Sequence, residues 1–218
     1  RSPDGQWDAY IKGYNVYITP VNADAKATKV EYALTMDGNE KLRYDQWAMR
    51  WSPDSRKIAT VKVKEVEERR IPLIESAPAT QKQPILQWRD YAKPGDVLPT
   101  SVPVLFDVEA RKQIALDTDL YENQFSLYLT GWRADSRAFT FEFNQRGHQR
   151  YVVGEVNAQT GAITHLADEQ VGTFFYYNMK YRHDLNDGAE MLWISERDGW
   201  RHIYMHDNKG QIKHQITR

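Results

Sequence analysis

The chain has 218 residues, of which 41% are hydrophobic, and it carries a formal net charge of −1. This balance excludes the basic surface that nucleic-acid binding usually requires, and the absence of cysteine excludes disulfides, cysteine-ligated zinc and a thiol nucleophile. Apolar runs are far shorter than the roughly 20 residues of a membrane-spanning helix, so no membrane span is expected in this segment.

The chain opens on a turn sequence that recurs along its length. Ser2-Pro3-Asp4-Gly5 comes first, and because position 1 is not Met we interpret the chain as an excised piece of a longer protein. The turn returns as Ser52-Pro53-Asp54-Ser55, in altered form as Ala134-Asp135-Ser136, and as Asp187-Gly188 alone. Its aspartates stand at positions 4, 54, 135 and 187, so successive copies are 50, 81 and 52 positions apart.

Each of the clearer copies precedes a segment with the two-residue period of a half-buried strand. Phe139, Phe141 and Phe143 alternate with small or polar residues, and so do Ala59, Val61 and Val63. Hairpin tips that contain glycine follow, since such turns often require positive φ. The expected second strands are Asn15–Ile18, Tyr151–Val156 and His202–His206, and the expected third strands are Ala162–Leu166 and Gln211–Thr217.

A repeat of about 40–50 residues built from short strands is typical of β-propeller blades. We therefore predict an all-β fold, a partial propeller of about four antiparallel blades that form an open arc. The expected blades are residues 1–47, 48–128, 129–180 and 181–218. The long second interval fits an insertion at residues 65–101, whose five prolines predict loop and edge strand because proline cannot donate to a ladder.

Four stretches resemble one known family. They are Ile71–Ser76 (IPLIES), Tyr91–Asp96 (YAKPGD), Phe141–Gln149 (FEFNQRGHQ) and Ile194–Tyr204 (ISERDGWRHIY). In this order they are similar to the N-terminal β-propeller of the dipeptidyl peptidase IV family, which belongs to the prolyl oligopeptidase group of serine peptidases. The resemblance covers most of residues 45–218.

This resemblance implies a two-domain exported peptidase, periplasmic or extracellular, whose propeller sits over an α/β-hydrolase domain with a Ser-Asp-His triad. The implied partners are a peptide substrate, that hydrolase domain and a second copy in a homodimer, and no cofactor is implied. In dipeptidyl peptidases of this family a pair of glutamates grips the free amino terminus of the substrate. An ammonium group removed from water needs such compensating carboxylates.

The chain departs from the family pattern in two respects. It reaches Arg218 without a Gly-x-Ser-x-Gly nucleophile elbow, so we expect it to contain no catalytic residue and to be inactive alone. The segment Lys41–Trp51, where the resemblance places the glutamate pair, contains no Glu-Glu. Glu67-Glu68 falls after the turn, and we interpret it as part of a hairpin in preference to an amine clamp. The substrate-binding residues therefore stay unknown at this stage.

The stretch Trp193–His206 (WISERDGWRHIYMH) looks like an active site, but its pattern favours a structural role. On a helix His202 and His206 would share a face and could bind zinc. The alternation between them predicts a strand, in which four positions span roughly 13 Å, so no metal site is expected. Ser195 precedes a hairpin and lacks the strand-to-helix turn of a nucleophile, so we expect it to end a strand and bond a turn amide.

The other candidates also have structural interpretations that we prefer. Arg146 and Arg197 stand beside the tip glycines of successive repeats, which favours a recurring ion pair or carbonyl contact that fastens the hairpin. The charged run Lys62–Arg70 is interpreted as a solvated hairpin. Tryptophans at repeat-linked positions are expected to pack between the sheets, and these are Trp51, Trp132, Trp193 and Trp200.

Three functions compete on this basis. The leading hypothesis is the non-catalytic, substrate-gating propeller part of a serine exopeptidase. The alternatives are a propeller scaffold for protein–protein interaction and a propeller glycosidase, for which the required pair of acids cannot be located. Because an incomplete propeller exposes sheet edges, we also predict that the chain self-associates.

Overall fold

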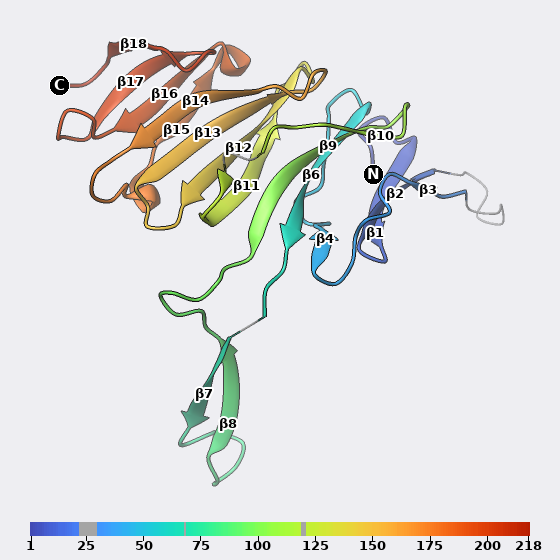
Figure 1. Cartoon of the computed structure of the whole chain (residues 1–218), viewed down its shortest axis with the longest axis vertical. Coiled ribbons are helices and arrows are strands. Elements are labelled where there is room, and N and C mark those ends of the chain that lie inside the picture. The colour runs from blue at the N-terminus through green and yellow to red at the C-terminus, as the bar shows by residue number, and fades with distance from the viewer. Residues whose placement is uncertain (22–29, 68, 119–120) are drawn as a thin grey trace.

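The structure, a computed structural model, describes residues 1–21, 30–67, 69–118 and 121–218. Four antiparallel sheets stand side by side in chain order, and a two-stranded hairpin projects below the second of them (Figure 1). Helix in the described residues includes the short 3-10 turns η2 (Tyr177–Met179) and η3 (Asn186–Gly188). The prediction of an all-β, partial propeller is confirmed.

The sheets follow the repeat of the sequence. The first contains β1 (Trp7–Lys12), β2 (Asn15–Pro20) and β3 (Tyr32–Ala33). The second contains β4 (Leu42–Tyr44), β5 (Arg50–Trp51), β6 (Lys57–Lys64), β9 (Thr100–Asp107) and β10 (Lys112–Ile114), with β4 and β5 both paired to β6. The third contains β11 (Gln124–Trp132), β12 (Ala138–Gln145), β13 (Arg150–Asn157) and β14 (Ile163–Gln170). The fourth contains β15 (Arg182–Leu185), β16 (Glu190–Ser195), β17 (His202–Asp207) and β18 (Ile212–Gln215).

The recurring turn links each sheet to the next by hydrogen bonds. Three backbone N–H groups donate to side chains of the following turn: Asp4 to Ser55 Oγ at 3.0 Å, Asp54 to Ser136 Oγ at 2.9 Å, and Ala134 to Asp187 Oδ1 at 2.9 Å. Each turn thus satisfies a backbone donor of the turn before it. The aspartates of the first three turns have a different role, since each accepts the backbone N–H two residues further on in its own turn.

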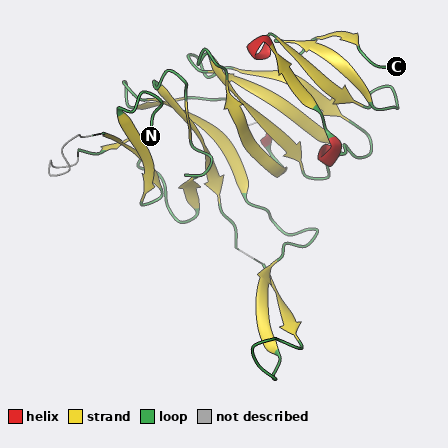
Figure 2. Cartoon of the chain, turned by 180° about the vertical axis from the view of Figure 1, so that it is seen from behind, coloured by secondary structure: helices red, strands yellow, loops and turns green. Residues whose placement is uncertain are grey.

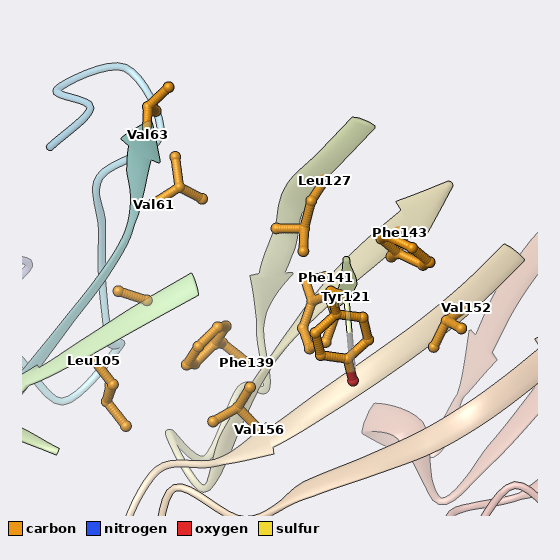
Figure 3. Packing of buried hydrophobic residues seen from close by; sticks show 11 residues of the cluster. Val61, Val63, Leu105, Tyr121, Leu127, Phe139, Phe141, Phe143, Val152 and Val156 are labelled. Carbon is orange, nitrogen blue, oxygen red and sulfur yellow. The ribbon is translucent and has the colours of Figure 1, made fainter. Parts of the chain in front are cut away.

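The hydrophobic core lies between the sheets, in three clusters. The first cluster joins the second and third sheets, where Phe139, Phe141 and Phe143 of β12 pack with Val61 of β6 and Leu105 of β9 (Figure 3). Alternation along β12 places the three rings on one face of the strand, as the two-residue period predicts. The buried face of each sheet is therefore the face that packs against a neighbouring sheet.

Close packing in the third sheet leaves no room for a side chain at Gly154 of β13. Gly154 pairs with Phe141 across the two strands, and a Cβ at this position would lie 2.3 Å from the Phe141 ring. Interiors packed this closely respond to a single added methyl group. Glycine is therefore required here by the ring beside it.

The proline-rich insertion forms an arm that extends away from the second sheet (Figure 2). Its strands β7 (Arg70–Glu75) and β8 (Ile85–Asp90) pair with each other in a separate two-stranded sheet. Pro72 lies opposite Trp88, in an edge strand, which is the position within a sheet where proline is tolerated. The expectation of an edge strand is met, while the extension of the arm from the body was not predicted.

We expect Gly154→Ala to destabilise the chain by about 1–3 kcal/mol, because the new methyl group forces Phe141 from its position. Denaturant unfolding followed by tryptophan fluorescence measures the change. Gly172→Ala is the control, since a Cβ there meets nothing within 4 Å. Equal stability of the two variants would contradict this account of the packing.

Candidate functional site

Ser195, the nucleophile-like residue of the sequence, is buried at the end of β16. Its Oγ donates to Glu169 Oε2 at 2.8 Å and accepts from the N–H of Arg197 at 3.3 Å and from the Arg197 Nε at 2.9 Å. His202 lies opposite Ser195 in the strand register, but its Nδ1 contacts Thr217 Oγ1 at 3.3 Å. The serine thus bonds a carboxylate that is itself paired with Arg197, and His202 contacts Thr217 and not the serine.

His202 and His206 lie on β17, in the strand that the sequence predicts. His206 is buried, and its Nδ1 contacts the carbonyl oxygen of Leu166 at 2.9 Å, which makes Nδ1 the donor. Its Nε2 has no partner among the described residues. Burial lowers the pKa of His206 below its ordinary value, so the ring is neutral in the folded chain.

Glu169 of β14 holds the fourth sheet to the third. This buried carboxylate accepts from Trp193 Nε1 at 2.9 Å, from Ser195 Oγ at 2.8 Å and from Arg197 Nη2 at 2.6 Å. The Arg197 guanidinium also covers the Tyr204 ring at 4.6 Å. The expected ion pair of Arg197 is present: Arg197 bonds Ser195 within its own hairpin, and its ion pair with Glu169 also joins that hairpin to the preceding sheet.

Arg146 makes the same kind of crossing with a different acceptor. Its Nη1 donates to the carbonyl oxygen of Asp96, in the connection between β8 and β9 of the second sheet. The expected contact of Arg146 with a carbonyl group is therefore present. Both arginines thus tie a hairpin tip to an earlier part of the chain, Arg197 to β14 of the third sheet and Arg146 to the loop that precedes β9.

A second buried carboxylate, Glu142 of β12, lies nearer the first strands of the third and fourth sheets. It accepts from Tyr128 and Tyr151 hydroxyls and from Lys180 Nζ, the last at 2.7 Å. Burial opposes its ionisation, but these bonds outweigh burial and hold the pKa of Glu142 below its ordinary value. Burial, and next the charge of Glu142, raises the pKa of Tyr151. The cluster is therefore an ionised carboxylate whose oxygens are occupied by two protonated tyrosines and Lys180, which is a stable structural pairing.

A chain of three side chains that the sequence did not reveal resembles a catalytic relay. Tyr121 Oη lies 2.8 Å from His165 Nε2, and His165 Nδ1 lies 3.2 Å from Asp168 Oδ2. Tyr121 is buried against Phe141 and Phe143, and burial raises its pKa to about 12. A phenol with this pKa stays protonated at neutral pH. These hydrogen bonds therefore have a structural role, and they join the segment before β11 to β14.

The first strands of the last three sheets meet along one edge. Trp132 Nε1 of β11 donates to the carbonyl oxygen of Arg50 in β5 at 3.1 Å, and Arg182 Nη1 of β15 donates to Thr130 Oγ1 of β11 at 3.2 Å. Propeller sheets are arranged around a central channel, and their strands approach each other most closely beside it. We call this first-strand edge the channel edge, after the side of a blade that borders the central channel of a propeller.

The segment Lys41–Trp51 lies on the first-strand edge and has no glutamate pair, in agreement with the sequence. Its one carboxylate, Asp45, accepts the backbone N–H of Trp47 at 2.7 Å. The Trp47 side chain is 88% exposed. The segment thus presents an indole ring at the channel edge and uses its carboxylate internally.

A groove follows the base of the arm. A cavity of about 660 Å³ is lined by Glu40, Lys41, Glu65, Val66 and Glu67, and a second of about 230 Å³ adjoins it beside Tyr91 and Pro99. Glu67 is exposed in both, while Glu68 lies outside the described residues. Lys62, the first residue of the charged run Lys62–Arg70, lies in β6 and forms an ion pair with Asp37. The groove is lined mainly by charged side chains at the point where the arm leaves the second sheet.

The four repeat-linked tryptophans divide into two kinds. Trp193 is fully buried, and Trp132 and Trp51 pack against the clusters between sheets, as predicted. Trp200 is 76% exposed, so its expected packing between sheets is wrong. It lies in the β16–β17 turn, beyond the sheet surface that a neighbour covers.

Across the described ranges, no group of three or more His, Cys, Asp or Glu residues could hold a metal ion. The same ranges contain no helix long and apolar enough to cross a membrane.

Comparison with known proteins identifies the family. The model of the dipeptidyl peptidase IV N-terminal region matches residues 1–218. The chain belongs to the dipeptidyl peptidase IV N-terminal region family. This agrees with the resemblance carried by the four sequence stretches, all of which contribute to the arm or to the ties between sheets.

Two solved structures are similar to this N-terminal region. Dipeptidyl peptidase 4 of Porphyromonas gingivalis superposes with a TM-score of 0.66 at 20% identity, covering 100% of this chain and 32% of its own. A candidate dipeptidyl aminopeptidase IV of Bacteroides ovatus gives 0.56 at 18% identity, covering 95% and 30%. These similarities support the fold, and the dipeptidyl peptidase IV N-terminal region here spans about a third of the length of either protein.

We expect Arg197→Ala to lower the free energy of unfolding by about 2–4 kcal/mol, because it leaves the buried Glu169 carboxylate without its cation. Arg201→Ala is the matched control in the same turn. It removes only the more exposed pair with Glu196, and the expected loss is about 0–1 kcal/mol. Equal losses in thermal or urea unfolding would show that the Glu169 contact does not hold the sheets.

The free energy of unfolding should also fall as the pH drops below about 6.5. His206 binds a proton there in the unfolded chain, whereas burial lowers its pKa and keeps it neutral in the folded chain. We expect part of the stability to be lost between pH 7 and 5.5 because of this group, measured by urea unfolding. His206→Asn keeps a donor for the Leu166 carbonyl and cannot titrate. The prediction requires a smaller pH dependence in this variant than in the unchanged chain.

Proposed function

We propose that this chain is the non-catalytic, substrate-gating propeller part of an exported serine exopeptidase that resembles dipeptidyl peptidase IV. The single observation that carries the proposal is the family match over residues 1–218. In this proposal a hydrolase domain elsewhere in the longer protein performs peptide hydrolysis, in the periplasm or outside the cell.

The arrangement of charges supports a gating role without chemistry. The buried carboxylate of Glu142 is committed to Lys180 and to tyrosine hydroxyls of its own sheet. The buried carboxylate of Glu169 is committed to Arg197 and Ser195 beyond its sheet. Such pairs stiffen a wall, and a stiff wall restricts a channel to small substrates. Peptides are then selected by size and by the groups on the channel edge.

A scaffold for protein–protein interaction is the second candidate, and the arm favours it. Its exposed apolar side chains include Ile74 (71%), Leu86 (58%) and Trp88 (61%). Exposed apolar surface of this kind is typical of contacts with another protein. A peptidase propeller can carry such a contact as well, so the arm does not by itself separate the two functions.

The purified chain should hydrolyse neither dipeptidyl nitroanilide substrates nor longer peptides, while the full-length parent protein should hydrolyse peptides and lose activity on treatment with a serine-directed phosphonate. The parent gene should encode a Gly-x-Ser-x-Gly elbow followed by Asp and His. A parent without this triad would overturn the peptidase proposal and favour the scaffold. Turnover by the 218-residue chain would overturn the non-catalytic role.

A further inference from the structure

The first strand of the second sheet is interrupted by a bulge that carries Trp47. Tyr44 pairs with Lys62 and Arg50 pairs with Ala59, so the five residues 45–49 lie opposite only residues 60 and 61. In the third sheet β11 is a single strand of nine residues. Extra residues in a strand redirect its side chains, and they are common beside functional sites.

Hydrogen bonds hold the bulge on both sides of Trp47. Asp45 Oδ1 accepts the Trp47 N–H at 2.7 Å, and Thr60 Oγ1 donates to the Asp45 carbonyl at 2.6 Å. Arg50 Nη1 donates to the carbonyl oxygens of Trp47 and Met49 at 2.7 and 2.9 Å. The backbone that carries the indole is therefore fixed before any ligand arrives.

Packing from three sheets adds to this rigidity. Ala48 packs against the cluster between the second and third sheets, and Met49 packs against the cluster between the first and second. Trp132 of the third sheet donates to the Arg50 carbonyl at 3.1 Å. The residues on either side of Trp47 are thus anchored, while Trp47 itself is the most exposed large hydrophobic side chain of the described chain, at 88%.

An exposed tryptophan on a fixed backbone is well suited to bind a ring. Tryptophan supplies a large contact area with little loss of rotamer freedom, and it is enriched at the centres of binding sites. Ring pairs contribute about 0.5–1.5 kcal/mol beyond the burial of their area. The fixed bulge removes the ordering cost that a mobile loop would add.

The charges beside the indole select the rest of the ligand. Asp45 is already engaged by backbone N–H groups and lies 3.8 Å from Arg43, so it offers little to an ammonium group. Arg50 is exposed, and its hydrogen bonds in the described chain go to carbonyl oxygens. The bulge therefore favours a carboxylate over a cation.

We propose that Trp47 and Arg50 form a peptide-binding site on the channel edge, which takes an aromatic side chain on the indole and a nearby peptide carboxylate on the guanidinium. This deepens the proposed function by naming a substrate class, and it rests on that function for its biological setting. The site needs no covalent chemistry, since it holds a peptide while the reaction occurs elsewhere.

The test is a titration of the 218-residue chain with Gly-Gly-Phe-Gly, followed by the indole N–H signals in ¹H–¹⁵N spectra. Trp47→Phe identifies the Trp47 signal among the seven indoles. We expect this signal to shift on titration, and we expect Gly-Gly-Ala-Gly to bind about tenfold more weakly, the equivalent of one lost ring contact. Amidation of the carboxyl terminus should weaken binding by about fivefold, because Arg50 loses its anion.

Variants distinguish binding at the Trp47 site from non-specific binding of the peptide to exposed aromatic rings. Trp47→Ala should weaken binding by about tenfold and Trp47→Phe by about threefold or less, because phenylalanine keeps a ring. Trp200→Ala is the matched control, since Trp200 is also exposed, at 76%, but lies in a turn of the fourth sheet. It should leave binding unchanged. Because Trp47 is exposed, the thermal midpoint of Trp47→Ala should stay close to that of the unchanged chain.

Three results would overturn the inference. They are equal binding of the Phe and Ala peptides, unchanged binding by Trp47→Ala, and a Trp47 signal that shifts with protein concentration alone, which would assign the ring to contact with a second copy. These outcomes are independent of the gene and activity tests of the proposed function. A parent without a triad would leave a peptide-binding site intact, and a failed titration would leave the peptidase proposal intact.

Discussion

A sheet in this arc can bury its faces only against the next sheet, and every buried charge in the interface must find its partner across the gap. Glu142 and Glu169 in the third sheet meet this requirement with Lys180 and Arg197 of the segment that follows. A carboxylate removed from water without such a partner would cost several kcal/mol. The pairs therefore set the order and orientation of neighbouring sheets more specifically than apolar contact does.

The same constraint separates structural polar groups from those free to bind. Ser195, Tyr121 and Tyr151 each look reactive by residue type, but each is buried and engaged within a network. The bulge at residues 45–49 shows the opposite arrangement, with the backbone engaged and the side chain of Trp47 left to solvent. Binding residues in this propeller are thus best sought where the backbone is held by hydrogen bonds and the side chain is exposed to solvent.

The sequence was sufficient to predict an all-β arc of antiparallel sheets, because its turn motif and the alternation in segments such as Phe139–Phe143 depend on local geometry. It also predicted that His202–His206 is a strand, which placed the two histidines apart. The targets of Arg146 and Arg197 could not be predicted, since their acceptors are separated from them by 50 and 28 positions. The exposure of Trp47 was hidden for a similar reason: only the strand register shows that its segment leaves the sheet.

The way the arm is attached has a consequence for how this fold can vary. β6 and β9 pair along their full length, from Lys57 opposite Asp107 to Lys64 opposite Thr100, so the blade is closed at the root of the arm. The chain between them is then a closed loop, and each doubling of such a loop adds only about 0.6 kcal/mol of closure entropy. The arm can lengthen, shorten or change its surface over evolutionary time while the blade beneath it keeps its register. The sequence of the arm can therefore change without a change in the strand pairing of the propeller.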